Sequence, residues 1–151
     1  MKILFVSHLN DCTAPVAVGI LKKILRQNHK SEIIDSAGFE PHLIGDSAGN
    51  DIIKYAKERG IDISEHVIRL FSSQDFDNFD KIYVMDYQTL KDVKFYARDD
   101  KDKKKVDYLM NVLLPGQNKY VPYPHRRNQE DFDVTFNLID KACKKIADLI
   151  E

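Results

Sequence analysis

The polar segment from Ser7 to Ala14 has the residue types and the position of an anion-binding loop. It follows an apolar run, Ile3–Val6, and precedes Pro15, a residue type favoured at the first position of a helix. N–H groups at a helix N-terminus have no partner within the helix and carry the positive end of its dipole, so phosphate-sized anions bind there. The segment contains no Lys or Arg and no strong nucleophile at its first position. The sequence therefore predicts an anion site without the groups that phosphate chemistry usually needs.

Other side chains could also supply chemistry. A hydrolase that uses Ser7 with His8 or His125 is disfavoured, because adjacent side chains diverge from a tight turn and no acid is placed to orient a histidine. Cys12 is either a reactive thiol at a helix N-terminus or a buried structural cysteine, and we favour the buried cysteine. Cys143 falls on the apolar stripe of a C-terminal helix, where a core position is expected. Two cysteines, with no Cys/His cluster at metal-ligand spacing, indicate no disulfide framework, no metal and no cofactor.

Length and composition favour one domain spanning residues 1–151, because 43% apolar residues can form one good core. Acidic and basic residues are interspersed and the formal net charge is −1, so neither nucleic acid nor a membrane is an expected partner. The basic run Lys103–Lys105 lies among acidic residues and is predicted to be a solvated loop. No signal-peptide pattern and no run of about 20 apolar residues is present, so we expect a soluble, cytoplasmic protein.

The elements that must position the Ser7–Ala14 segment alternate between strand-length apolar runs and helical periods. This alternation is typical of a parallel sheet covered by helices on both faces. The expected strands are residues 2–6, 31–36, 81–85 and 105–110. The expected helices are 15–27, 47–59, a short one within 72–80, and 130–150, with a loop over 115–128. Ligands of such sheets bind outside the carboxyl ends of the strands, which is where the segment after the first strand should lie. Neither GxGxxG nor GxxxxGK[ST] is present, which disfavours dinucleotide and Walker-type sites.

Several motifs in order along the chain resemble the low-molecular-weight protein tyrosine phosphatase family. They are VSHLNDCTAPVAV (Val6–Val18), Ser36-Ala37-Gly38, RGIDISEH (Arg59–His66) with Arg69 after it, FDKIYVMD (Phe79–Asp86) and VPYPHRR (Val121–Arg127). The resemblance covers the chain from end to end. It implies a single-domain, three-layer α/β/α fold around a four-stranded parallel sheet with strand order 2-1-3-4.

The reaction of this family needs a cysteine thiolate at the start of the loop, an arginine at its end and an aspartic acid on the late loop. The resemblance places Ser7, Thr13 and Tyr123 at these three positions. It also places Ala14 where a hydroxyl residue would help to hold the thiolate. We therefore expect a non-catalytic pseudophosphatase that binds a partner or an anion. The alternative is a protein tyrosine phosphatase with residual or altered activity.

Parts of the supporting frame match the family. Asn10, Ser36 and His66 match residues that brace the loop, and asparagine can adopt the left-handed conformation that a tight anion nest requires. Leu9 stands in place of a glycine. Asp11 stands where the family is usually apolar, and either weakens anion binding or points into solvent. The expected anion-binding loop comprises Ser7, His8, Leu9, Asn10, Asp11, Cys12, Thr13 and Ala14.

The late loop carries positive charge where the family has an acid and paired tyrosines. His125, Arg126 and Arg127 form a candidate cation lid, of which one member would reach over the pocket and partly replace the missing arginine. The other interpretation is that these cations only face solvent. Expected ligands are phosphate, sulfate or a phosphotyrosine protein, and the sequence gives no indication of the oligomeric state.

Overall fold

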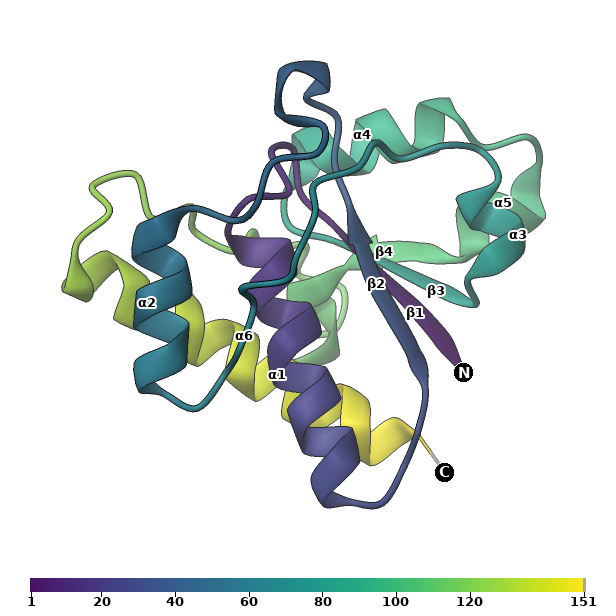
Figure 1. The fold of residues 1–151 in the computed structure, drawn as a ribbon. Helices are drawn as coiled ribbons and strands as arrows, with labels where there is room; N and C mark the ends of the chain where they lie inside the picture. The colour runs from purple at the N-terminus through teal and green to yellow at the C-terminus, as the bar shows by residue number, and fades with distance from the viewer. Residues whose placement is uncertain (151) are drawn as a thin grey trace.

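The computed structural model describes residues 1–150 of the chain (Figure 1). Its strands are β1 (Lys2–Val6), β2 (Ile33–Ala37), β3 (Lys81–Val84) and β4 (Val106–Tyr108). Its α-helices are α1 (Thr13–Gln27), α2 (Asn50–Glu58), α3 (Asp75–Asn78), α4 (Tyr87–Phe95), α5 (Asp100–Lys104) and α6 (Gln129–Leu149). Two short 3-10 helices are η1 (Pro41–Leu43) and η2 (Leu109–Val112).

The four strands form one parallel sheet in the order β2-β1-β3-β4, which confirms the expected order. Val6 at the end of β1 is in register with Ala37 of β2 and with Val84 of β3. The carboxyl ends of the three strands therefore meet at one edge of the sheet. The segments after β1, β2 and β3 all begin at this edge.

Both faces of the sheet are buried, which gives the expected three layers. Ile3 and Phe5 of β1 point into a core with α1, α2 and α6, whereas Leu4 and Val6 point into a second core with α3 and α4. Figure 1 shows α1, α2 and α6 on one side of the sheet and α3, α4 and α5 on the other. This single α/β domain holds the ends of the strands rigidly from both sides.

Some boundaries differ from the sequence expectation. Helix α1 begins at Thr13 rather than at Pro15. Pro15 fits within the first turn, because the N–H groups of that turn have no partner inside the helix and the one that proline lacks is not needed. The expected strand over 105–110 is only β4, because the chain turns into η2 at Leu109. Helix α6 begins at Gln129, where the side chain of Asn128 accepts a hydrogen bond from the N–H of Asp131.

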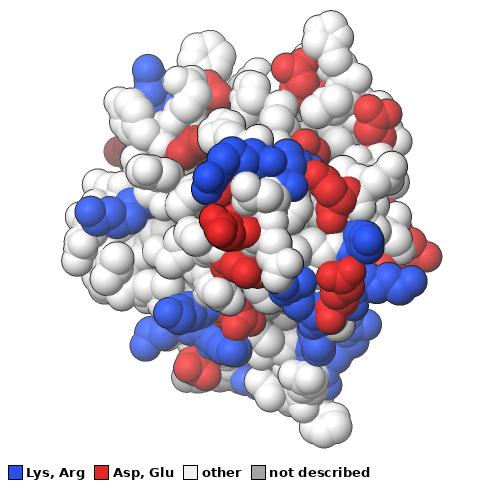
Figure 2. All heavy atoms as spheres, turned by 90° about the vertical axis from the view of Figure 1, so that its left-hand side faces the viewer, with Lys and Arg blue, Asp and Glu red and all other residues white. Residues whose placement is uncertain are grey.

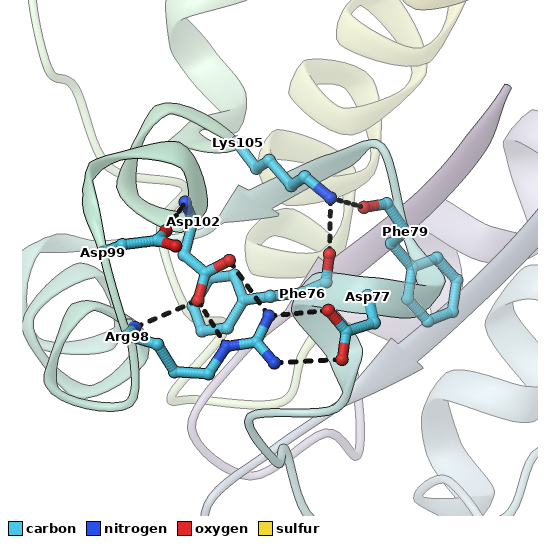
Figure 3. Close-up of polar contacts among 7 residues, drawn as sticks. All are labelled: Phe76, Asp77, Phe79, Arg98, Asp99, Asp102 and Lys105. Carbon is cyan, nitrogen blue, oxygen red and sulfur yellow. Dashed lines mark hydrogen bonds and ion pairs between the residues drawn. The ribbon is translucent and has the colours of Figure 1, made fainter.

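The prediction of a solvated loop at Lys103–Lys105 was wrong. Lys103 and Lys104 belong to α5, whose first turn is capped by Asp99, and Arg98 makes charged hydrogen bonds with Asp77 and Asp102 (Figure 3). The ammonium of Lys105 donates to the backbone carbonyls of Phe76 and Phe79. These contacts fasten α5 to the segment that leads into β3.

The edge strand β2 is flanked by a second segment of chain. Gly38, directly after β2, forms an isolated parallel bridge with Leu70. The guanidinium of Arg69 binds Asp35 of β2 through Nε and the buried carboxylate of Asp75 through Nη1 and Nη2. The arginine that belongs to the family motif is therefore part of the frame of this edge.

Figure 2 shows one face of the molecule, on which acidic and basic side chains are interspersed. Within residues 1–150, no helix has both the length and the apolar character needed to cross a membrane. In the same range, no group of three or more His, Cys, Asp or Glu residues is placed to hold a metal ion.

Candidate functional site

The segment after β1 folds into a tight loop around the hydroxyl of Ser7. The backbone of Asn10 is left-handed, with φ 56°, and its N–H donates to Ser7 Oγ at 3.0 Å. Nε2 of His66 donates to the carbonyl oxygen of Asn10 at 2.8 Å. Burial lowers the pKa of His66, so the ring is neutral at neutral pH and its proton is on Nε2. His66, in the segment between α2 and α3, thus holds the loop in place through the backbone of Asn10.

The segment after β2 presses against the other side of the loop. The N–H of Phe39 donates to the carbonyl of His8 at 2.8 Å. A Cβ at Gly38 would lie 2.7 Å from Cβ of Asn10 and 2.9 Å from the carbonyl oxygen of His8, so only glycine fits there. Ser36 is buried nearby, but its hydroxyl has no hydrogen-bond partner within residues 1–150. The expected support from Ser36 is therefore not a direct hydrogen bond.

Backbone N–H groups of the loop are free to bind a ligand. Within residues 1–150, no acceptor is found for the N–H groups of His8, Leu9, Cys12, Thr13 and Ala14. The last two are in the first turn of α1, a helix of 15 residues, and carry the positive end of its dipole. Unpaired donors of this kind at a helix start can bind a phosphate-sized anion.

A cavity of about 350 Å³ opens onto the loop at the carboxyl edge of the sheet. Its lining residues are Ser7, His8, Leu9, Thr13, Met85, Asp86, Val121, Tyr123 and His125. The three residues that the resemblance assigned to nucleophile, arginine and acid positions, Ser7, Thr13 and Tyr123, thus line one cavity. They come from the end of β1, the start of α1 and the loop before α6.

The cavity does not contain a serine hydrolase dyad. Ser7 Oγ accepts the Asn10 N–H, and within residues 1–150 it makes no hydrogen bond to a histidine. The carboxylate of Asp86 caps α4 by accepting the N–H of Thr89 at 2.8 Å. No acid therefore orients His8 or His125 in the part of the chain that the structure describes.

Tyr123 is held by two charged residues that do not line the cavity. Its hydroxyl accepts a hydrogen bond from Nη1 of Arg127 at 2.9 Å and lies 3.4 Å from the carboxylate of Asp11. Burial, with the nearby Asp11 charge, raises the pKa of Tyr123 to about 12. A phenol of such high pKa is a weak proton donor to a leaving group.

Asp11 does not point freely into solvent, and its effect on anion binding stays a prediction. It does not line the cavity, and it is half-buried against Tyr123 rather than directed into solvent. Burial raises the pKa of Asp11, while the charge of Arg127 opposes that shift. The negative charge of Asp11 is thus partly balanced by the positive charge of Arg127.

The candidate cation lid divides into three different environments. Arg127 binds the carboxylate of Asp51 in α2 through Nε and Nη2, and Arg126 binds Asp131 in α6. Of the three lid residues, His125 alone lines the cavity. Neither arginine lines the cavity, so His125 is the lid residue placed to reach over it, and Arg127 does not merely face solvent. No feature of the sequence pointed to Asp51 as the partner of Arg127.

Both cysteines are buried in the core. Cys12 is 1% exposed, and burial raises the pKa of its thiol to about 12, so the interpretation as a reactive thiol is disfavoured. Cys143 lies in α6 with its Sγ 3.5 Å from the carbonyl oxygen of Ala17, and burial raises its pKa as well. Neither thiol lines the cavity.

The comparisons with known proteins agree over the whole chain. The family model "Low molecular weight phosphotyrosine protein phosphatase" matches residues 2–151. The low molecular weight phosphotyrosine protein phosphatase of Gallus gallus is 28% identical over 145 residues, covering 95% of this chain and 91% of the relative. The protein tyrosine phosphatase of Entamoeba histolytica, crystallised with Hepes in its active site, superposes with a TM-score of 0.88 at 28% identity, covering 97% of this chain and 94% of that one. Vibrio vulnificus Wzb in complex with benzylphosphonate gives a TM-score of 0.85 at 27% identity over 99% and 98% of the two chains. The chain belongs to the low molecular weight phosphotyrosine protein phosphatase family.

Proposed function

We propose that this protein is a non-catalytic member of its family, a pseudophosphatase that binds a phosphate-type anion or a phosphotyrosine protein in the cavity over the Ser7–Ala14 loop. The observation that carries the proposal is the meeting of Ser7, Thr13 and Tyr123 in that cavity. The loop keeps its donors, but these positions supply no thiolate, guanidinium or aspartic acid.

The chemistry of these three side chains supports binding without turnover. Within the described residues Ser7 makes no hydrogen bond to a base, and its oxygen already accepts the N–H of Asn10. A threonine in place of arginine forgoes a charged hydrogen bond worth about 1.5–3 kcal/mol. Absence of an effective general acid costs a further factor of about 10² to 10⁴ in rate. These losses act on one transition state, so they do not simply add, but together they leave negligible catalysis.

The walls of the cavity support an aromatic ligand. Leu9, Met85 and Val121 line it with apolar atoms, while the free N–H groups lie at the start of α1. A ring placed against these side chains would direct its phosphate toward the donors. The neighbour Vibrio vulnificus Wzb was solved with benzylphosphonate, which joins an aromatic ring to such an anion.

Two measurements on the purified protein test this proposal. Calorimetry with a phosphotyrosine peptide should give saturable heat, and the same peptide with unphosphorylated tyrosine is the matched control. An assay with p-nitrophenyl phosphate should give no turnover above that of the Ser7→Ala variant. Hydrolysis well above that background would refute the non-catalytic proposal, and absence of heat at millimolar peptide would refute the binding proposal.

The combination Ser7→Cys, Thr13→Arg and Tyr123→Asp tests whether these three positions alone limit catalysis. We expect measurable phosphatase activity in the triple variant and none in the matched single variant Thr13→Arg. An inactive but folded triple variant would mean that the frame itself no longer fits the reaction.

The alternative function is a protein tyrosine phosphatase with residual or altered activity. Family membership favours it, and so does the position of the Ser7 hydroxyl within the cavity. If Ser7 acts as a nucleophile, slow breakdown should leave a phosphoserine at position 7 after incubation with a phosphate ester. Mass spectrometry of the peptide that contains Ser7 would detect the added phosphoryl group.

We also propose that residues 1–151 work as one domain in the cytoplasm. Cys12 and Cys143 are both free, which suits a reducing compartment. Fractionation of cells that express the tagged protein would test the compartment. Recovery from a secreted or membrane fraction would refute it.

A further inference from the structure

Two histidines from distant parts of the chain line the cavity together. His8 follows Ser7 in the loop after β1, and His125 lies in the loop before α6. Both residues are exposed, which places them at the mouth of the cavity rather than in its floor. Within the described residues, no Lys or Arg lines this cavity. The two imidazoles are therefore the side chains that could bring positive charge to a bound anion.

The arginines nearest in sequence are already engaged. Arg126 binds Asp131, and Arg127 binds Asp51 and the hydroxyl of Tyr123. Moving either guanidinium to the cavity would leave a carboxylate without its partner. His125 has no such partner, and its ring packs edge-on against Tyr123 with centroids 5.0 Å apart. This contact holds the imidazole at the cavity wall.

We propose that His8 and His125 are the cationic ligands of the anion, so that binding in this cavity requires their protonation and strengthens as the pH falls. The inference rests on the proposed function, because it concerns the same cavity and the same anion. It assigns to histidine the positive charge that the family resemblance gives to an arginine at the position of Thr13. Arginine would bind at any physiological pH, whereas histidine makes binding conditional.

The energetics favour a charged partner for the anion. N–H groups and a helix dipole supply only partial charges, while the cavity wall includes apolar side chains and the carboxylate of Asp86. A protonated imidazole donates a charge-assisted hydrogen bond, which is roughly twice as strong as a neutral one. Conversely, a bound dianion holds the proton on each imidazole, so binding and protonation are linked.

The charged and titratable groups around the two histidines do not cancel this effect. They are Asp86 in the cavity wall, Tyr123 beside His125, Asp11 behind Tyr123, Asp131 near His125, and the paired Arg126 and Arg127. The hydrogen bond from Arg126 lowers the pKa of Asp131, so this carboxylate is charged at neutral pH. Arg126 and Arg127 are paired with carboxylates and therefore do not oppose a positive charge on the imidazoles.

Sulfate is the probe that tests this inference, because its double charge stays constant over the range in which imidazole titrates. Sulfate affinity is measured by calorimetry between about pH 5 and about pH 8 at constant ionic strength. Each imidazole that must be protonated makes the affinity fall about tenfold per pH unit above its titration range. Measurement in two buffers of different ionisation enthalpy should show proton uptake on binding at neutral pH.

Variants identify which groups take up the proton. His8→Gln and His125→Gln should each reduce proton uptake, and the double variant should bind sulfate weakly with no dependence on pH. His42→Gln is the matched control, because the side chain of His42 is 92% exposed and lies outside the cavity. It should leave both affinity and proton uptake unchanged.

The outcomes separate this inference from the proposed function. Equal sulfate affinity across the pH range, without proton uptake, would overturn the role of the histidines while anion binding itself stands. Binding at no pH would overturn both. Proton uptake is measured on the unmodified protein, so the inference can fail even where a variant does not fold.

Discussion

The left-handed backbone of Asn10 can be tested with a matched pair of substitutions, Asn10→Ala and Asn10→Gly. Both remove the side chain, whose Nδ2 and Oδ1 are buried without a partner within residues 1–150, and both keep the N–H that binds Ser7 Oγ. The two variants then differ in one respect. Alanine has a Cβ that opposes the observed φ of 56°, whereas glycine adopts this conformation freely.

The expected difference has a definite sign. The left-handed conformation costs a residue with Cβ about 1–2 kcal/mol. Against this, alanine loses about 0.4–1 kcal/mol less backbone entropy than glycine when the chain folds. The alanine variant should therefore be less stable than the glycine variant by about 0.8 kcal/mol at the midpoints of these ranges and by at most about 1.6 kcal/mol, and its loop should bind sulfate less tightly.

Urea unfolding of both variants measures the difference, and a second pair at Lys54 is the control. Lys54 is exposed within helix α2, so alanine should be more stable than glycine there by about 1 kcal/mol. The reasoning is refuted if alanine is at least as stable as glycine at position 10. In that case the loop would not be left-handed at Asn10 in solution.

Three further predictions concern residues that do not line the cavity, namely the pair of Asp51 and Arg127, Asp11 and Cys12. The double-mutant cycle of Asp51→Asn and Arg127→Met should give a coupling of about 0.5–1 kcal/mol, since the side chains are 42% and 26% exposed and solvent screens the pair. The hydrogen bond from Arg127 lowers the pKa of Asp51. The coupling is therefore present above pH 3.8, the ordinary pKa of aspartic acid, and is lost as the pH falls through the lowered pKa. Additive effects of the two substitutions on urea unfolding at neutral pH would contradict this prediction. Asp11→Asn should stabilise the protein at neutral pH, because burial raises the pKa of Asp11 and penalises its charged form. This gain in stability should vanish below pH 3.8, the ordinary pKa of aspartic acid. A difference in thermal unfolding between the variant and the unmodified protein that does not change with pH would argue against this prediction. Cys12 should react with iodoacetamide at neutral pH only after unfolding in urea, as followed by mass spectrometry, and ready alkylation of the folded protein would show that the thiol is accessible.

The elements with strong hydrophobic patterns could be predicted from the sequence. β1, β3, α1 and α6 lie within a few residues of their expected positions, because each has an apolar run or stripe that a core must bury. Helix α4 was not expected, since its nine residues bury little and give only a weak apolar pattern. Helix α5 was missed for a related reason, because its stability depends on contacts with Asp77 and Phe76 that lie far away in the sequence.

The family resemblance predicted which residues line the cavity, but it did not predict how the charged side chains around the cavity pair. Motif positions identify Ser7, Thr13 and Tyr123, because strand ends and loop lengths fix where the backbone runs. The partner of each charged side chain depends on rotamers and on residues from other elements. Nothing in the pattern around Arg127 distinguishes pairing with Asp51 from reaching over the cavity.

The ion pairs over β2 also matter for contacts between molecules. An edge strand exposes N–H and C=O groups to which a strand of another chain can pair, and charged side chains on the edge oppose such pairing. Here a second strand would have to pack beside the ion pair of Arg69 and Asp35, whose charges oppose such pairing. The opposite edge, β4, has only three residues and offers little backbone to extend. The sheet is therefore protected at both edges against aggregation through strand addition, whatever ligand the loop at its carboxyl end binds.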